Sequence, residues 1–252
     1  MKMIDTHCHL GELEYDQNRN EIIKRAIERD IVMITSATRI DQYSLNLELA
    51  SSSASIYTAL GLNPINHYEC EKAISLIKEH RDSIIAIGEC GLDHYLERDH
   101  DERKKQESVF VKMIDLALEL KLPIQIHSRS AGAAALAVLR NNGAQRVHLH
   151  AFDGKSNLAR IASTELGYYF SIPTSVVRSP QKRKLVKAVA IDRLLIETDS
   201  PVLSPVIGQL NEPANLPIAL REIASILHME EEEIGKIVLE NICRLYSRIR
   251  PK

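Results

Sequence analysis

Side chains of the types that bind metal ions lie at the ends of several short apolar runs. His7 and His9 close the first run, which begins at Met3. Residues two apart in a β-strand point to the same face, so these two imidazoles could bind one metal ion from one side. Asp5, on the same face, could accept hydrogen bonds that orient them. Later runs end in, or are followed by, further ligand types, namely Glu89, His127, His150 and Asp199.

These four imidazoles and two carboxylates suit two divalent metal ions. If one carboxylate bridges the ions, each ion keeps a position open for water, as in hydrolytic sites that use a metal-bound hydroxide. Asp199 is then the candidate general base. A lone histidine at a strand end is more often an ordinary core residue, but ionisable groups at five strand ends would be costly to bury without a cation. Imidazole ligands favour Zn²⁺ or Mn²⁺ over Mg²⁺.

The elements that must position these residues form a repeating pattern. Eight runs rich in apolar and β-branched residues alternate with helix-like stretches, which indicates a parallel sheet. Dividing 252 residues among eight units gives about 31 residues each, the size of one βα repeat. We therefore predict an α/β fold, a (β/α)8 TIM barrel whose strand ends meet at one mouth. The predicted strands are 3–9, 31–37, 55–62, 84–89, 122–127, 146–150, 167–172 and 193–198.

Helical periodicity is clearest at residues 20–28 and 109–120, where apolar residues recur every three or four positions. Two further helices, predicted at 214–227 and 230–248, follow the last strand and would cover the seam where the barrel closes. No linker or shift in composition divides the chain, so we expect one domain, residues 1–252, with additional C-terminal helices.

The composition excludes several classes of protein. Hydrophobic residues make up 44% of the chain, charged residues 26%, and the net charge is −2, so the chain is not a disordered protein and has no global basic field. The four cysteines are scattered without a CxxC pair, which fits a reducing compartment. The sequence shows no signal peptide and no apolar run of about 18 residues. We expect a cytoplasmic protein that needs no membrane and no obligate protein partner.

Five motifs occur in order along the chain. They are IDTHCHL at 4–10, GECGLD at 88–93, PIQIHSR at 123–129, HAFDG at 150–154 and ETDSP at 197–201, with NEP at 211–213 and Asn241 beyond them. In these motifs the chain resembles the TatD family of metal-dependent hydrolases, within the amidohydrolase-like superfamily of TIM barrels. One motif would be weak support, whereas five in register over nearly the whole chain are specific.

The resemblance implies a ligand set and an activity. Two groups of ligands would share Glu89 as a bridge: His7, His9, Glu89 and Asp199 for the first ion, and Glu89, His127 and His150 for the second. Members of the family are mostly metal-dependent deoxyribonucleases, often 3′ exonucleases, so the implied partner is the 3′ end of DNA. Deacylation of D-aminoacyl-tRNA has also been attributed to some members, which keeps ester or amide hydrolysis as an alternative.

The substrate-facing residues depart from the family pattern. Asn63 stands where many members have a histidine, and it can form hydrogen bonds but carries no charge. Arg129 is a candidate phosphate ligand, and Tyr95 could either stack on a base or pack within its own loop. A basic run could bind a nucleic-acid backbone; it comprises Arg178, Lys182, Arg183, Lys184 and Lys187. A solvated helix face is the favoured explanation for the run as a whole. Within the run, Arg178 is the better candidate for a contact with the nucleic acid.

Two other classes stay open. Many cyclic amidases, lactonases and deaminases of the superfamily bridge their metals with a carboxylated lysine, and Glu89 at that position argues against them. A non-catalytic scaffold that carries metals would be expected to have lost a ligand, and the complete set argues against that class. Release of mononucleotides from an oligonucleotide would separate these classes from a nuclease.

Overall fold

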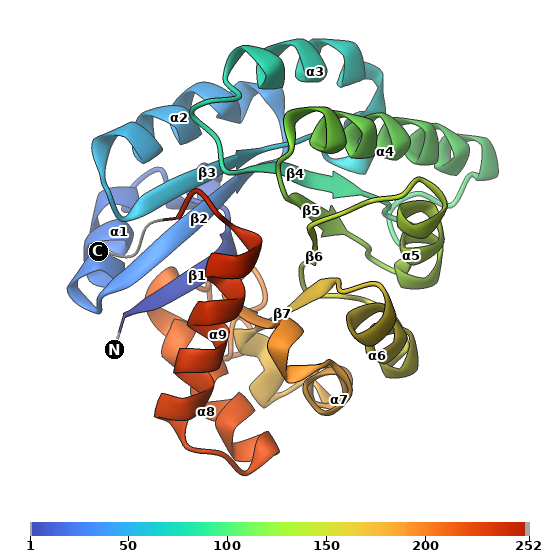
Figure 1. The fold of residues 1–252 in the computed structure, drawn as a ribbon. Helices are drawn as coiled ribbons and strands as arrows, with labels where there is room; N and C mark the ends of the chain where they lie inside the picture. Colours follow the sequence, from blue (N-terminus) through green and yellow to red (C-terminus); the bar gives the residue numbers. More distant parts are fainter. Residues whose placement is uncertain (1, 250–252) are drawn as a thin grey trace.

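The computed structural model describes residues 2–249, and its strands form one parallel sheet in sequence order (Figure 1). This confirms the predicted α/β barrel. Strands such as β2, IVMITSA, are buried along their whole length, as expected where helices cover the outside of the sheet. The strands are β1 Met3–Cys8, β2 Ile31–Ala37, β3 Ile56–Leu60, β4 Ala86–Gly91, β5 Ile124–His127, β6 Val147–Leu149, β7 Tyr169–Pro173 and β8 Leu194–Glu197.

The ends of β1 and β8 bring the two edges of the sheet together. The Asp199 N–H donates to the His7 carbonyl at 2.9 Å, and the His9 N–H donates to the Ser200 carbonyl at 2.8 Å. Lower in the barrel, the Thr6 hydroxyl donates to the Ile196 carbonyl at 2.7 Å. The barrel is therefore nearly closed, and its seam lies beside the predicted metal ligands on β1 and after β8.

Helices surround the strands, and the two predicted C-terminal helices cover the seam (Figure 1). Helix α9 contacts both β1 and β8, and α8 packs against β8 and α9. The helices are α1 Arg19–Glu28, α2 Tyr43–Ser52, α3 Cys70–Glu79, α4 His100–Leu120, α5 Gly132–Asn141, α6 Ser156–Glu165, α7 Pro180–Ala188, α8 Leu216–Leu227 and α9 Glu231–Leu245.

Strand β4 continues past its predicted end at Glu89. A Cβ atom on Gly91 would lie 2.1 Å from the His127 carbonyl oxygen, and the φ angle of Gly91 is +143°, so only glycine fits here. The close approach lets Gly91 pair with His127 on β5. Glu89 therefore lies inside a strand with fixed neighbours rather than at a frayed strand end.

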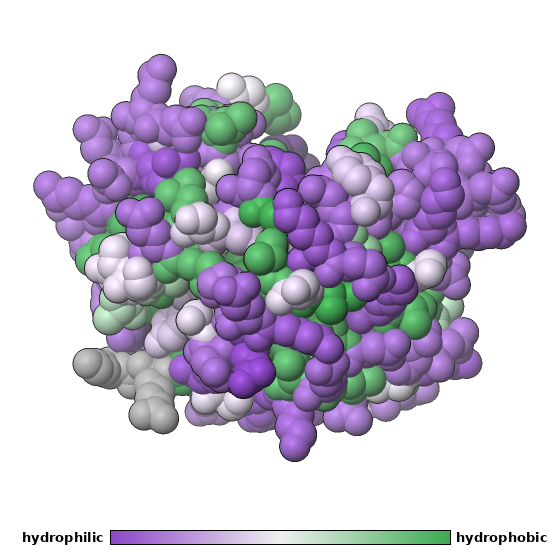
Figure 2. Space-filling model, turned by 90° about the horizontal axis from the view of Figure 1, so that it is seen from above, coloured by the Kyte–Doolittle hydropathy of each residue, from purple (hydrophilic) through white to green (hydrophobic). Residues whose placement is uncertain are grey.

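Hydrophilic residues predominate on the face shown in Figure 2, with hydrophobic residues scattered among them. Over residues 2–249, no helix is long and apolar enough to cross a membrane. The cytoplasmic location stays a prediction.

Candidate metal centre

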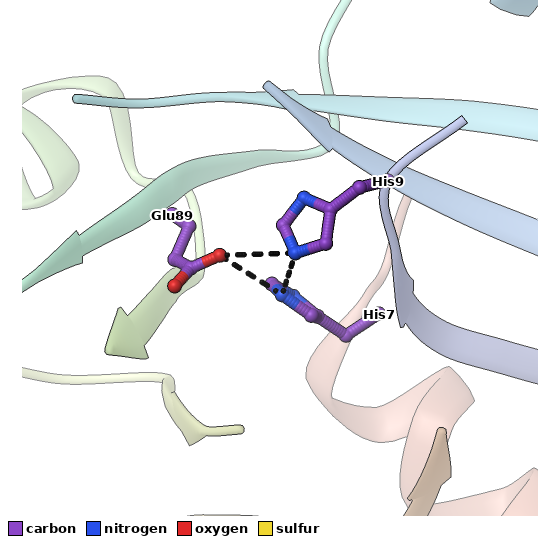
Figure 3. A group of neighbouring side chains, drawn as sticks. All are labelled: His7, His9 and Glu89. Atoms are coloured by element: carbon purple, nitrogen blue, oxygen red, sulfur yellow. Dashed lines mark hydrogen bonds and ion pairs between the residues drawn. The ribbon is translucent and has the colours of Figure 1, made fainter. Parts of the chain in front are cut away.

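The side chains of His7, His9 and Glu89 point toward one another from β1, the residue after β1, and β4 (Figure 3). One oxygen of Glu89, Oε2, lies 3.1 Å from His7 Nε2 and 3.3 Å from His9 Nε2. The two imidazole nitrogens are 3.2 Å apart. Asp199 joins this group, because its Oδ1 lies 3.3 Å from His9 Nε2 and 3.8 Å from His7 Nε2.

The other oxygen of Glu89 faces a second pair of histidines. Glu89 Oε1 lies 2.6 Å from His127 Nδ1 and 3.0 Å from His150 Nε2. The structure thus brings together all six residues predicted as ligands. They form three overlapping groups whose ligand atoms lie within 4.8 Å of one another: His7, His9 and Glu89; His7, His150 and Asp199; and Glu89, His127 and His150.

Hydrogen bonds outside the centre fix the tautomer of His9. Its Nδ1 lies 2.9 Å from the backbone carbonyl of Ser36. A carbonyl only accepts, so Nδ1 carries the proton in the neutral ring and Nε2 presents a lone pair to the centre.

The tautomer of His7 is fixed through Gln125. The Gln125 amide nitrogen donates to the Thr6 carbonyl at 3.1 Å, which turns Oε1 toward His7 Nδ1 at 3.2 Å. His7 therefore also presents Nε2 to the centre. The prediction that Asp5 orients these imidazoles is wrong. Its carboxylate instead accepts from the Thr198 N–H at 2.9 Å and the Thr198 hydroxyl at 2.5 Å, which ties β1 to the end of β8.

His127 is oriented by Asp93, which was not predicted as a site residue. His127 Nε2 lies 3.0 Å from Asp93 Oδ2, so this nitrogen donates and Nδ1 faces Glu89. The backbone N–H groups of Tyr95 and Leu96 donate to the other carboxylate oxygen at 2.9 and 2.8 Å. The only sequence signal for Asp93 was its place in the motif GECGLD, which does not reveal its partner.

The arrangement of donors and acceptors fits cations. Nε2 of His7, Nε2 of His9 and Nδ1 of His127 all present lone pairs toward the carboxylate of Glu89. Buried lone pairs and carboxylate oxygens that converge repel unless a proton or a cation lies between them, and a divalent cation can serve several of them at once. The imidazole of His150 offers Nε2 to the same centre, while its buried Nδ1 has no hydrogen-bond partner within residues 2–249.

Without a cation, charges within the centre shift the proton affinities of its members. Burial disfavours a proton on His9, but the hydrogen bond with Asp199 and the charge of Glu89 outweigh burial and raise the pKa of His9 to about 10. Hydrogen bonds with Asp93 and Glu89 likewise overcome burial and raise the pKa of His127 to about 9. Burial and the neighbouring His150 lower the pKa of His7 to about 4. Protons on His9 and His127 therefore stand in for the positive charge that a cation would bring, whereas His7 stays neutral at pH 7.

A cavity of about 360 Å³ opens directly beside the centre. Its size is near the lower end of the roughly 300–1,000 Å³ typical of small-molecule sites. Its walls include members of the centre, two basic residues and an apolar loop after β8, among them His127, His150, Asp199, Arg129, Lys182 and Leu203.

The four predicted substrate residues lie in different places. Arg129 lines the cavity, and its guanidinium stacks 3.9 Å from the ring centre of the exposed Tyr95. Asn63 and Arg178 do not line the cavity. Asn63 Oδ1 accepts from the Ile65 N–H at 3.0 Å, and Arg178 Nε donates to the Ser204 carbonyl at 2.9 Å.

The rest of the basic run divides by burial. Lys182 is buried against the cavity, Arg183 pairs with Glu222 on α8, and Lys184 and Lys187 are exposed. A solvated helix face thus explains Lys184 and Lys187 but not Lys182. The sequence analysis did not single out Lys182.

Known proteins resemble this chain over nearly all of its length. Residues 4–247 match the family described as TatD related DNase. Human deoxyribonuclease TATDN3 is 31% identical, covering 98% of this chain and 96% of the human protein. A metal-dependent hydrolase of Methanocaldococcus jannaschii is 35% identical, covering 98% of each chain. The TatD homologue YJJV of Escherichia coli shares the fold, with a TM-score of 0.88 at 24% identity over 97% of this chain and 98% of that chain. By these matches, the chain belongs to the TatD related DNase family.

Proposed function

We propose that this protein is a two-metal hydrolase that removes nucleotides from the 3′ end of DNA. The observation that carries the proposal is the position of Glu89, whose two oxygens each face a different pair of histidines. The names of the human and archaeal relatives support a metal-dependent deoxyribonuclease. Because all the ligands come from strands of one barrel, we further propose that residues 1–252 work as one domain.

We assign the ions to two positions. The first ion would be held by His7, His9, Asp199 and Glu89 Oε2, and the second by His127, His150 and Glu89 Oε1. When bound, two divalent cations lower the pKa of an attacking water and polarise the phosphoryl oxygen. Four imidazoles favour Zn²⁺ or Mn²⁺, with Mg²⁺ as the weaker binder.

The chain's own residues would orient the substrate and move the proton. Asp199 lines the cavity and would accept the proton of the attacking water. The water oxygen would bond to phosphorus while the bond from phosphorus to the 3′ oxygen of the remaining strand breaks. That oxygen then takes a proton from solvent. Arg129 would hold a phosphate and Tyr95 a base at the rim, with Asn63 and Arg178 as more distant contacts. A cavity of about 360 Å³ suits one terminal nucleotide rather than a long strand.

The test combines metal content with DNA degradation. Freshly purified protein should contain close to two metal ions per chain by elemental analysis. The same sample, supplied with Mn²⁺, Mg²⁺ or Zn²⁺, should release nucleotides stepwise from 3′-labelled single-stranded DNA. Glu89→Ala and Asp199→Ala should each lower the rate by at least about a hundredfold while the barrel stays folded. Glu240→Ala, which changes an exposed carboxylate on α9, should leave the rate unchanged.

Each other outcome has a definite meaning. Two metals without DNA degradation would refute the nuclease and direct the search to esters, amides and aminoacyl-tRNA. Full turnover by both the Glu89→Ala and Asp199→Ala variants at saturating metal would refute the ligand assignment. No metal after reconstitution would refute the two-metal site itself.

A further inference from the structure

Lys182 on α7 is an unusual lysine, because only 9% of its surface is exposed. Lysine is among the residues that are almost never buried without a partner. The side chain nevertheless reaches the wall of the cavity beside the candidate metal centre, which Asp199 and His150 also line.

The hydrogen bonds of Lys182 leave its charge without a direct counterion. Its Nζ donates to the carbonyls of Ala151 and Phe152, at 2.7 and 2.9 Å. Within residues 2–249, no carboxylate lies at ion-pair distance from it. An ammonium group has three N–H donors, so the two carbonyls leave one donor for another acceptor.

Holding the strand β6 loop does not require a charged group. The neutral side chain of Gln181 donates to the Phe152 carbonyl at 3.1 Å and to the Gly154 carbonyl at 3.0 Å. Burial lowers the pKa of Lys182, although the carboxylates of Glu197, Asp153 and Asp199 act in the opposite direction. The protein thus keeps a lysine at a position where burial disfavours its charge and where a neighbouring amide already secures the loop.

The cavity has the character of a site for an anion with an apolar portion. Arg129 and Lys182 supply positive charge, while Val202 and Leu203 line it with apolar side chains. Asp153 also lines the cavity, and its Oδ2 accepts from the Ser130 N–H at 2.7 Å. An anion that entered here would share the cavity with both the candidate metal centre and Lys182.

We propose that Lys182 binds the substrate phosphate, through a non-bridging oxygen on the side away from the metal centre. The cavity is thereby a phosphoester site, in which a buried ammonium selects anionic over neutral esters. This inference rests on the proposed hydrolase and deepens it by assigning the group that recognises the phosphate. A single buried lysine suits this task because it offers a point charge to a tetrahedral anion.

The experiment compares three variants of the Mn²⁺-loaded protein with inorganic phosphate as the probe. Lys182→Met removes the charge and the donors, and Lys182→Gln keeps a donor without the charge. Lys184→Met, an exposed lysine on the same helix, is the matched control. By calorimetry, the Kd for phosphate should rise about ten- to a hundredfold in both Lys182 variants and stay within about twofold in the control. The metal content should not change.

The substrate preference gives a second measure. The value of kcat/KM for bis(4-nitrophenyl) phosphate should fall by about the same factor in the Lys182 variants, whereas any hydrolysis of neutral 4-nitrophenyl acetate should not. An unchanged Kd for phosphate in Lys182→Met, or full affinity in Lys182→Gln, would show that Lys182 only holds the loop and would overturn the proposal. If the wild-type protein hydrolyses no phosphodiester, the proposed function fails, yet the phosphate affinities still decide the role of Lys182.

Discussion

Three of the four histidines in the centre are each oriented by a different kind of partner. His9 donates to a backbone carbonyl, His7 faces an amide oxygen, and His127 donates to the carboxylate of Asp93. A carboxylate partner raises the basicity of an imidazole more than a neutral one does. His127 should therefore be the most strongly donating of these three ligands, and the second ion should depend on Asp93.

Asp93→Asn tests this dependence. Asparagine can still accept a hydrogen bond from His127 but lacks the charge, so the affinity for the second ion and the hydrolytic rate should each fall about ten- to a hundredfold. Metal titration by calorimetry measures the affinity, and circular dichroism checks the fold. Asp82→Asn, at an 85% exposed aspartate, is the control. An unchanged second metal affinity would mean that the charge of Asp93 does not tune His127.

At the scale of elements, the end of α9 completes the interior of the barrel beneath the centre. The fully buried Tyr246 follows α9, and its hydroxyl accepts from the Gln125 amide at 2.9 Å and lies 2.6 Å from His148 Nδ1. His148 Nε2 lies 2.6 Å from the Ser171 hydroxyl, which donates to Glu197 at 2.5 Å. The donors and acceptors form one consistent chain from β5 through α9 to β6, β7 and β8.

Tyr246→Phe removes one hydroxyl from this chain. The change leaves the buried His148 Nδ1 without its partner and removes one of the two acceptors of the Gln125 amide, so the free energy of unfolding should fall by about 1–3 kcal/mol. Urea unfolding measures the loss, with Tyr68→Phe as the control, because Tyr68 is 77% exposed. Gln125 also orients His7, so the variant should bind the first ion more weakly. Equal stability of the two variants would contradict the role assigned to the hydroxyl.

The elements that the sequence predicts well are those with a local pattern. The strands carry continuous apolar, β-branched runs, so all eight could be predicted. Helix α4 was predicted only from 109, whereas it begins at His100. Its first nine residues, HDERKKQES, have no apolar period, and the helix starts there because Asp99 caps the N–H groups of Asp101 and Glu102.

For the whole molecule, parallel topology explains why the grouping of the six candidate ligands could be predicted and their supports could not. Strand ends in a barrel converge at one mouth, so His and carboxylate residues at five ends had to meet. The partners of those ligands depend on contacts between distant segments. Gln125 reaches Thr6 across 119 positions, and Lys182 reaches the Ala151 carbonyl across 31. No local pattern encodes such contacts, so the roles of Asp93, Gln125 and Lys182 emerged only from the structure.

The same topology should make the stability of the whole barrel depend on metal. The proposed ligands lie on or directly after β1, β4, β5, β6 and β8, so ions bound to them join both sides of the seam. Ions that bind only the folded state stabilise it by mass action, by about 4 kcal/mol at a free concentration a thousandfold above Kd. For a chain of this length that corresponds to a rise in Tm of about 8–16 °C.

Protein stripped with a chelator should therefore melt lower by that amount and recover on adding Mn²⁺ or Zn²⁺, as followed by calorimetry. Glu89→Ala should lose most of the shift, because both proposed ions would share this carboxylate, whereas Glu240→Ala should keep it. A metal-independent Tm in the wild type would show that the ligands do not bind ions as a unit across the barrel.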